Sequence, residues 1–266
     1  NQSIRDHTKM MGGFTFLQND YVLNHIPATV IGRLAYLSTY LSFQNQLLID
    51  NDGTPMLKRD LSDILGISRQ KANDFYNVCA SNNLLFDHGA DGLYINEIFF
   101  RNSTKNKQQI RLYRDPIQQL YKTIIKDKQN STQALRHFGY VVQLIPWINR
   151  EWNILCSNPN ETEPGKIIPL SLKEITLILH IDETNVGRLK KTLLKPLFKW
   201  NNEYQQLCSC MKVTTDEGIQ ETVYVNPNLL FAGSDFDKVA GIGVAFTKHK
   251  TAEKQANVEK SEKSTA

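Results

Sequence analysis

The feature that most constrains this chain is one pattern of apolar residues that occurs twice, 114 residues apart. The copies are KRDLSDILGISRQKANDFY at 58–76 and LKEITLILHIDETNVGRLK at 172–190. Their apolar positions coincide at Leu61 and Ile175, Ile64 and Ile178, Leu65 and Leu179, Ile67 and Ile181, Ala72 and Val186, and Phe75 and Leu189. A matching tail follows each copy, LYIN at 93–96 and VYVN at 223–226. A repeat at a fixed offset predicts that one supersecondary unit is built twice.

Each copy has the pattern of a helix-turn-helix, in which an apolar inner face holds a second helix whose polar face is exposed. In the first copy Gly66 permits a left-handed turn and Ser68 can cap the second helix. In the second copy His180 replaces Gly66, and His tolerates positive φ better than most residues. Asp182 can cap there.

The flanking segments predict a winged helix around each copy. We expect extended segments at 14–17 and 21–23, a helix over 28–41 and a hairpin of 84–87 with 93–99, because AspGly lies between apolar runs. Asp115-Pro116 is expected to start a linker helix, and a further helix begins near 133. The second hairpin is expected from 205–213 and 219–226. The predicted fold is mainly α with small β-hairpin wings (α+β), as tandem winged helix-turn-helix domains joined by a helical linker.

At 266 residues the chain suits two domains of ordinary size. The expected division has five parts: an N-terminal arm at 1–27, a winged-helix domain at 28–104, a basic helical linker at 105–131, a second winged-helix domain at 132–240 and a flexible C-terminal tail at 241–266. The tail has almost no apolar residues after 247, which favours disorder.

Positive charge is concentrated between the two copies. The net charge of the chain is +4, whereas 101–129 has eight basic and two acidic residues, so the remainder is slightly acidic. Such a concentration is expected of an element that contacts phosphates, although a solvated linker face would have the same composition.

The residues expected to contact DNA follow from these patterns. Arg can bond guanine bidentately, and Asn or Gln can bond adenine, so polar residues on the outer face of the second helix of each copy are candidates for base contacts. The candidates are Lys58, Arg59, Ser68, Arg69, Gln70, Lys71, Asn73, Asn77, Lys105, Lys107, Arg111, Thr184, Asn185, Arg188 and Lys191.

Two features oppose a simple pair of DNA-binding domains. The hairpin tips are HGADG and TTDEG, without the Arg or Lys that a wing in the minor groove usually has. Glu183 would repel phosphate at the start of the second helix of the second copy. The alternative is therefore a protein-interaction module whose winged helices bind a polymerase or another regulator.

No other class of function has a pattern in its favour. The chain has no phosphate-binding G-x-x-x-x-G-K-[ST] loop, no H-E-x-x-H and no G-x-S-x-G, so no enzyme is expected. The four cysteines lack the paired spacing of a zinc site, so no metal or cofactor is expected. No apolar run approaches the length of a membrane span and no secretory signal is visible, so we expect the cytoplasm or nucleoid of a bacterium and no membrane.

The stretch ISRQKANDFYNVCASNNLLF at 67–86, followed by GLYIN, resembles the winged-helix replication initiators of small plasmids from low-GC Gram-positive bacteria and related phage replication and regulatory proteins. The second copy has a similar ending, YVNPNLLF. MarR-like repressors share the same fold pattern. The resemblance implies that Arg69, Gln70, Lys71 and Asn73 make base and phosphate contacts at an origin or operator.

The expected function is site-specific binding of double-stranded DNA by a protein of phage or plasmid type, in transcription regulation or DNA replication. The sequence leaves open which of the two processes follows, and whether the chain forms a homodimer or has a protein partner.

Overall fold

The computed structural model describes residues 2–18, 23–43, 45–101, 109–194, 196–215, 218–241 and 246–248. Within these residues the chain is a mixed α+β structure with small antiparallel sheets, as the sequence predicts. The first repeated unit, called unit one here, comprises residues 14–101. Its elements are β1 (Phe14–Gln18), α2 (Ala28–Ser38), a 3-10 turn (Lys58–Asp60), α3 (Leu61–Leu65), α4 (Arg69–Ser81), β2 (Leu85–Asp87), a second 3-10 turn (Gly89–Asp91), β3 (Leu93–Ile95) and β4 (Phe100–Arg101).

Unit two comprises residues 109–231 and has the same order of elements with two insertions. Its shared elements are β5 (Gln109–Tyr113), α6 (Ser131–Gln143), α7 (Leu172–Ile178), α8 (Val186–Leu193), β8 (Cys208–Thr215), β9 (Gly218–Val225) and β10 (Leu230–Phe231). Its 3-10 turns, at Ile145–Trp147 and Glu183–Asn185, stand at other places than those of unit one. The insertions are α5 (Arg114–Lys126) and the hairpin of β6 (Pro196–Trp200) with β7 (Glu203–Gln206), and they pack against each other. A 3-10 turn (Pro164–Lys166) precedes α7.

The two units share one four-stranded sheet in the order β10-β5-β1-β4. Its central strands are antiparallel, with Phe16 opposite Arg111. On one edge Phe16 and Leu17 pair with Arg101 and Phe100, and on the other edge Arg111 and Leu112 pair with Phe231 and Leu230. Rotation by about 180° around the Phe16–Arg111 pair therefore exchanges β1 with β5 and β4 with β10.

Helices α2 and α6 cross at this approximate two-fold axis through two glycines. A Cβ atom on Gly139 would lie 1.8 Å from the carbonyl oxygen of Ala28, and one on Gly32 would lie 2.9 Å from that of Leu135. The crossing therefore uses two positions four residues apart in each helix, Ala28 and Gly32 in α2 and Leu135 and Gly139 in α6. Only glycine at Gly139 allows the backbones to approach this closely.

The hydrogen bonds inside each unit also repeat. Gln46 (φ 60°) and Asn153 (φ 55°) both adopt the left-handed conformation, and their side-chain amides donate to the carbonyls of Phe100 and Leu230, the latter at 2.6 Å. Both tails end in an asparagine whose side chain accepts a hydrogen bond from the backbone amide two residues later. Asn96 accepts from the amide of Ile98 at 3.0 Å, and its counterpart Asn226 accepts from that of Asn228 at 2.9 Å.

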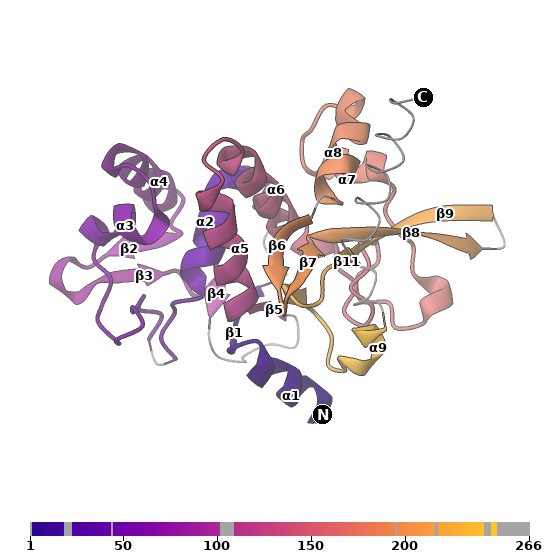
Figure 1. Ribbon diagram of the computed structural model, residues 1–266, viewed down its shortest axis with the longest axis horizontal. Helices are drawn as coiled ribbons and strands as arrows, with labels where there is room; N and C mark the ends of the chain where they lie inside the picture. Colours follow the sequence, from indigo (N-terminus) through magenta and orange to yellow (C-terminus); the bar gives the residue numbers. More distant parts are fainter. Residues whose placement is uncertain are drawn as a thin grey trace, which may run out of the picture.

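One continuous hydrophobic core fills both units. Its buried members include Leu17, Phe75, Phe138, Leu189 and Leu230. Burial of each such side chain stabilises the fold by roughly 1.5–3 kcal/mol. Figure 1 shows the result: α5 and α6 lie above the central sheet, while the hairpins β2–β3 and β8–β9 project to opposite sides.

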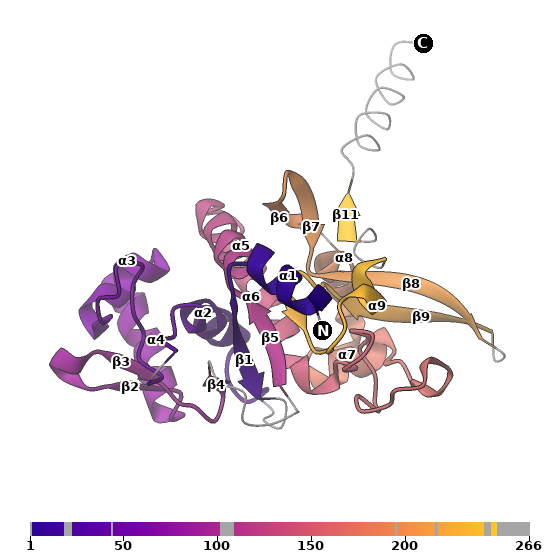
Figure 2. The same ribbon diagram turned by 90° about the horizontal axis from the view of Figure 1, so that it is seen from below.

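Helices α1 (Gln2–Met10) and α9 (Asp237–Ala240) lie at the lower edge of the molecule in Figure 1, opposite α4 and α8, and on the near side in Figure 2. The strand β11 (Thr247–Lys248) pairs with β7. His7 on α1 stacks on Phe236 with ring centroids 3.4 Å apart and is buried. That burial lowers the pKa of His7 to about 4, so the side chain is neutral near pH 7.

Four sequence expectations need correction. The N-terminal arm contains the helix α1, whose apolar side packs on residues near the other end of the chain that local periodicity does not show. The expected linker contains the strand β5 before its helix, and that helix begins at Arg114 instead of Asp115. The strand expected at 205–213 is two strands, because β7 pairs with β6 and β8 pairs with β9. Residues 21–22 and nearly all of 241–266 lie outside the described residues.

Candidate nucleic-acid interface

The first copy of the repeat forms two helices joined by a left-handed turn. Helix α3 ends at Gly66, which has φ 61°. The hydroxyl of Ser68 accepts from the amide of Lys71 at 3.4 Å and caps α4. Leu65 and Phe75 are buried between the helices. The turn and the cap are therefore at the residues that the sequence predicts.

The outer face of α4 does not pack against the hydrophobic core. All the candidate residues on this helix and at its cap are exposed: Ser68, Arg69, Gln70, Lys71, Asn73 and Asn77. The side-chain amide of Gln70 donates to Asp74 at 2.9 Å within the helix. Just before α3, Lys58 lies 3.9 Å from the ring centre of Tyr76, and the side chain of Arg59 is 80% exposed. Lys58 thus lies beside the C-terminal half of α4, whereas Arg69 and Lys71 lie in its first turn, where the helix dipole also favours an anion.

Helix α5 supports the turn before α4. The hydroxyl of Tyr121 donates to the carbonyl of Leu65 at 3.0 Å, and its ring stacks on Tyr36 at 3.9 Å. Burial raises the pKa of Tyr121 to about 12, so the hydroxyl keeps the proton that it donates. Ile125 lies directly beside Gly66. Helix α5, an insertion of unit two, thus packs against the turn of unit one.

The second copy has the same plan with a different second helix. Ser171 and Glu174 form a reciprocal capping box at the start of α7, and these hydrogen bonds hold the pKa of Glu174 below its usual range. His180 has φ 53°, which confirms the expected left-handed turn. Asp182 accepts from the amide of Thr184 at 2.8 Å. The segment that follows begins as a 3-10 turn, and α8 has 8 residues where α4 has 13.

The candidate residues of unit two divide into two groups. Thr184, Arg188 and Lys191 are exposed, whereas Asn185 is half-buried. Glu183, which the sequence suggests would repel phosphate, lies 3.0 Å from Lys173. This exposed ion pair offsets part of the negative charge at the start of the segment.

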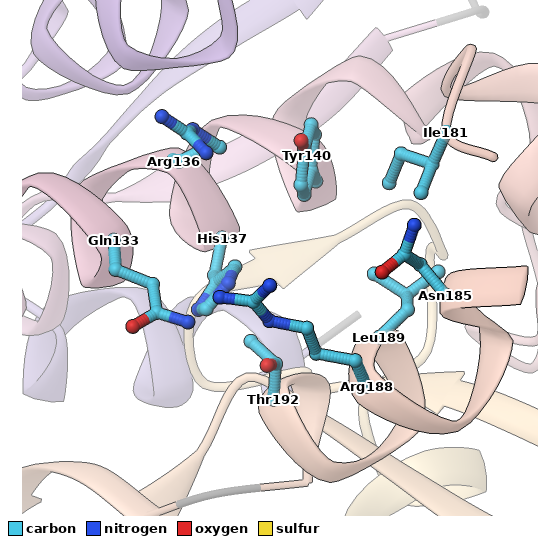
Figure 3. A pocket seen from close by; sticks show the side chains of 9 residues that line it. All are labelled: Gln133, Arg136, His137, Tyr140, Ile181, Asn185, Arg188, Leu189 and Thr192. Atoms are coloured by element: carbon cyan, nitrogen blue, oxygen red, sulfur yellow. The ribbon is translucent and has the colours of Figure 1, made fainter.

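A cavity of about 210 Å³ separates α8 from α6. Figure 3 shows Arg188 extending from α8 toward His137 and Gln133 on α6, with Asn185 on the opposite wall. Tyr140 and Ile181 close one end of this cavity. Sequence reasoning missed the α6 side of this site, because His137 and Arg136 lie in a helix whose periodicity shows only a packing role.

A second cavity, of about 300 Å³, lies beneath the start of α4. It is lined by polar groups from three helices and the turns before them, among them Arg33 of α2, Lys71 of α4, Lys128 and the first residues of α6. Arg33 stands in an otherwise apolar helix, so no local signal in the sequence points to it.

The basic residues between the two copies do not form one surface within the described part of the chain. Lys105 and Lys107 lie outside those residues. Arg111 does not share the exposed face, because its strand is central in the sheet: its guanidinium donates to the carbonyl of Gly233 at 2.6 Å and lies over the rings of Phe14 and Phe16. Lys122, Lys126 and Lys128 on and after α5 are exposed.

The second helices of the two copies occupy the same edge of the molecule. In Figure 1, α4 and α8 both lie at the upper edge, on either side of the turn that joins α5 to α6. The two helices and the turn after α5 are thus brought to one edge of the molecule. The hairpin residue His88, by contrast, packs on Tyr94 away from this edge.

The cysteines form no disulfide, and Cys79, Cys156 and Cys208 are buried. Burial raises the pKa of Cys208 to about 12 and that of Cys156 to about 11, so both thiols stay protonated. Across the residues that the structure describes, no three His, Cys, Asp or Glu side chains gather where they could hold a metal ion. In that same part of the chain no helix combines the length and apolar character needed to span a bilayer.

No family model matches this chain, and neither a curated protein nor a solved structure matches it.

Proposed function

We propose that this protein binds double-stranded DNA at a specific site, through two winged helix-turn-helix units, as a phage- or plasmid-type protein of transcription regulation or replication initiation. It would act by occupying an operator or origin in the bacterial cytoplasm, without catalysis. The observation that carries the proposal is the common edge occupied by α4 and α8, each with an exposed polar and basic face. The major groove is wide enough to accept such a helix.

The two-fold relation between the units defines how the site would be arranged. Helices related by a two-fold axis meet DNA in opposite directions, as in dimeric helix-turn-helix proteins. The two half-sites should therefore be inverted relative to each other and one helical turn apart. Because α4 has Arg69 and Asn73 where unit two has Glu183 in the preceding 3-10 turn and Gly187 in α8, the two half-sites should differ in sequence.

Selection of bound duplexes from a random pool, followed by footprinting, tests this proposal. We expect one enriched sequence with two protected patches separated by about 10 base pairs. Flipping one half-site should weaken binding, whereas exchanging the two inverted half-sites recreates the same site on the other strand and should leave binding unchanged. Binding that is absent for every duplex, or that does not change with salt, would overturn the proposal, since phosphate contacts make affinity steeply salt-dependent.

A pair of charge reversals connects the binding to the proposed face. Arg69→Glu with Lys71→Glu should weaken specific binding about 100-fold. The matched control is Arg5→Glu with Lys9→Glu, which changes the net charge equally on exposed positions of α1 at the opposite edge. Equal losses in both variants would show that net charge alone governs the binding.

The hairpin β2–β3 favours the second candidate function, a protein-interaction module. Its strand β2 exposes Phe86, and the adjoining residues Asp87 and Asp91 make the tip acidic. A partner such as a polymerase or another regulator would bind there. Charge reversal on α4 would leave such a complex intact, and Phe86→Ser would disrupt it without changing DNA affinity.

A further inference from the structure

The cavity beneath the start of α4 has the properties of a site for one phosphate group. Its polar lining consists of Arg33, Ser68, Lys71, Lys128, Ser131 and Thr132, and we call this set the phosphate seat. Isoleucines of α5 and Leu135 supply its apolar floor. These polar residues come from three separate segments of the chain, at residue 33, residues 68–71 and residues 128–132, so the fold brings them together.

The charge of the seat is unbalanced. Three of its residues are cations, and no Asp or Glu is among the described residues that line it. Within the described part of the chain none of these three cations forms an ion pair. Arg33 hydrogen-bonds Tyr121, but its Nε atom is buried without a hydrogen-bond partner. A buried donor left unpaired costs free energy that an anion would recover.

Two helices direct their positive ends toward the same cavity. Both α4 and α6 have 13 residues, and Ser68 and Ser131 stand at their starts. Asn130, which precedes α6, makes no capping hydrogen bond with its side chain. The first amides of a helix and its dipole together favour an anion such as phosphate.

The seat also lies where a DNA backbone would pass. It adjoins the turn between α5 and α6, which separates α4 from α8 at the upper edge in Figure 1. We propose that the seat binds a backbone phosphate of the DNA segment between the two half-sites. This assignment rests on the proposed function, and it adds a third point of attachment that belongs to neither recognition helix.

The first test measures the salt dependence of binding to a 30-base-pair duplex of arbitrary sequence, because phosphate contacts are independent of sequence. Lys128→Gln should weaken binding about three- to tenfold at 0.15 M salt and should lower the slope of log K against log salt by about 1. The control is Lys9→Gln, an exposed lysine of α1, which should change neither quantity.

The second test places a negative charge in the seat without damaging the fold. Thr132 is exposed in the first turn of α6, where an acidic residue favours the helix dipole. Thr132→Asp should therefore keep or raise the Tm while it weakens duplex binding at least tenfold. Thr132→Asn, of nearly the same shape but neutral, should stay within about twofold of the original chain.

A third arm distinguishes DNA from a free phosphate ligand. Pyrophosphate is added to the DNA-free protein, and the Tm is measured for the original chain and for Thr132→Asp. Stabilisation by pyrophosphate that disappears in Thr132→Asp, together with weakened duplex binding, supports the seat for DNA. If both seat variants bind duplex as the original chain does, the assignment to DNA is overturned while the proposed function stands. If the original chain binds no duplex, both proposals fail.

Discussion

Units one and two share strand registers and turns, but they differ in their second helices and hairpins. The strand registers, the left-handed turns and the two tail asparagines recur in both units, although few of the residues are identical. The second helix is continuous in unit one and begins as a 3-10 turn in unit two. The hairpin strands have 3 residues in unit one and 8 in unit two. Positions that satisfy backbone hydrogen bonds are thus retained, while exposed positions have diverged.

The largest effect is expected where the two units touch. Gly139→Ala places a Cβ atom against the backbone of Ala28, so the helices must separate, and we expect a loss of about 3 kcal/mol or more in the free energy of unfolding. Gly32→Ala should cost less, about 1–2 kcal/mol, because its closest contacts begin at 2.9 Å. Urea denaturation measures both.

The control for this pair is Gly187→Ala in α8, where a Cβ atom would meet nothing within 4 Å. It should be neutral or stabilise by up to about 1 kcal/mol through helix propensity. Similar losses at Gly139 and Gly187 would contradict the close crossing of α2 and α6.

The next effect compares the two recognition helices. Arg69→Glu with Lys71→Glu should weaken duplex binding about 100-fold, because this pair lies at the start of a long, well-capped helix. Arg188→Glu with Lys191→Glu should weaken it about tenfold, because these residues lie later in a shorter helix that follows Glu183. Titration of a selected duplex measures the ratio, and a larger loss from the unit-two pair would reverse the ranking of the units.

A smaller effect on stability is expected at the two left-handed turns. Gly66→Ala should destabilise the fold by about 1–2 kcal/mol, because φ is 61° and the new Cβ would lie 3.0 Å from Ile125. His180→Gly should stabilise it by up to about 1 kcal/mol, because glycine adopts φ 53° without strain. Thermal unfolding should therefore shift in opposite directions, and a shift in the same direction would contradict the equivalence of the turns.

The smallest effect concerns the helix caps and depends on pH. Ser171→Ala should cost about 1 kcal/mol near pH 7 and should return the pKa of Glu174 toward its ordinary range. A carboxylate whose folded pKa is lowered stabilises the fold above its unfolded pKa, and this contribution is lost as pH falls through the folded pKa. The difference between the original chain and Ser171→Ala should accordingly shrink in acid. Ser68→Ala should cost a similar amount without this acid dependence, since its capping bond involves no carboxylate.

Local patterns predict only part of this structure. The repeat, the two turns, the caps at Ser68 and Asp182 and the end of α4 near residue 82 all follow from residues close in sequence. Helix α1 and the strand β5 do not, because both are stabilised by segments more than 90 residues away. Arg33 illustrates the same limit for the candidate site: it joins Lys71 and Lys128 only after α2, α4, α5 and α6 have packed.

The symmetric sheet has a consequence for assembly. Two identical chains that form a homodimer are usually related by a two-fold axis, as the two halves of this sheet are. Here both halves belong to one polypeptide, so their association is intramolecular and does not depend on protein concentration. A dimer of separate units would come apart on dilution, whereas this chain keeps its two units together in one molecule.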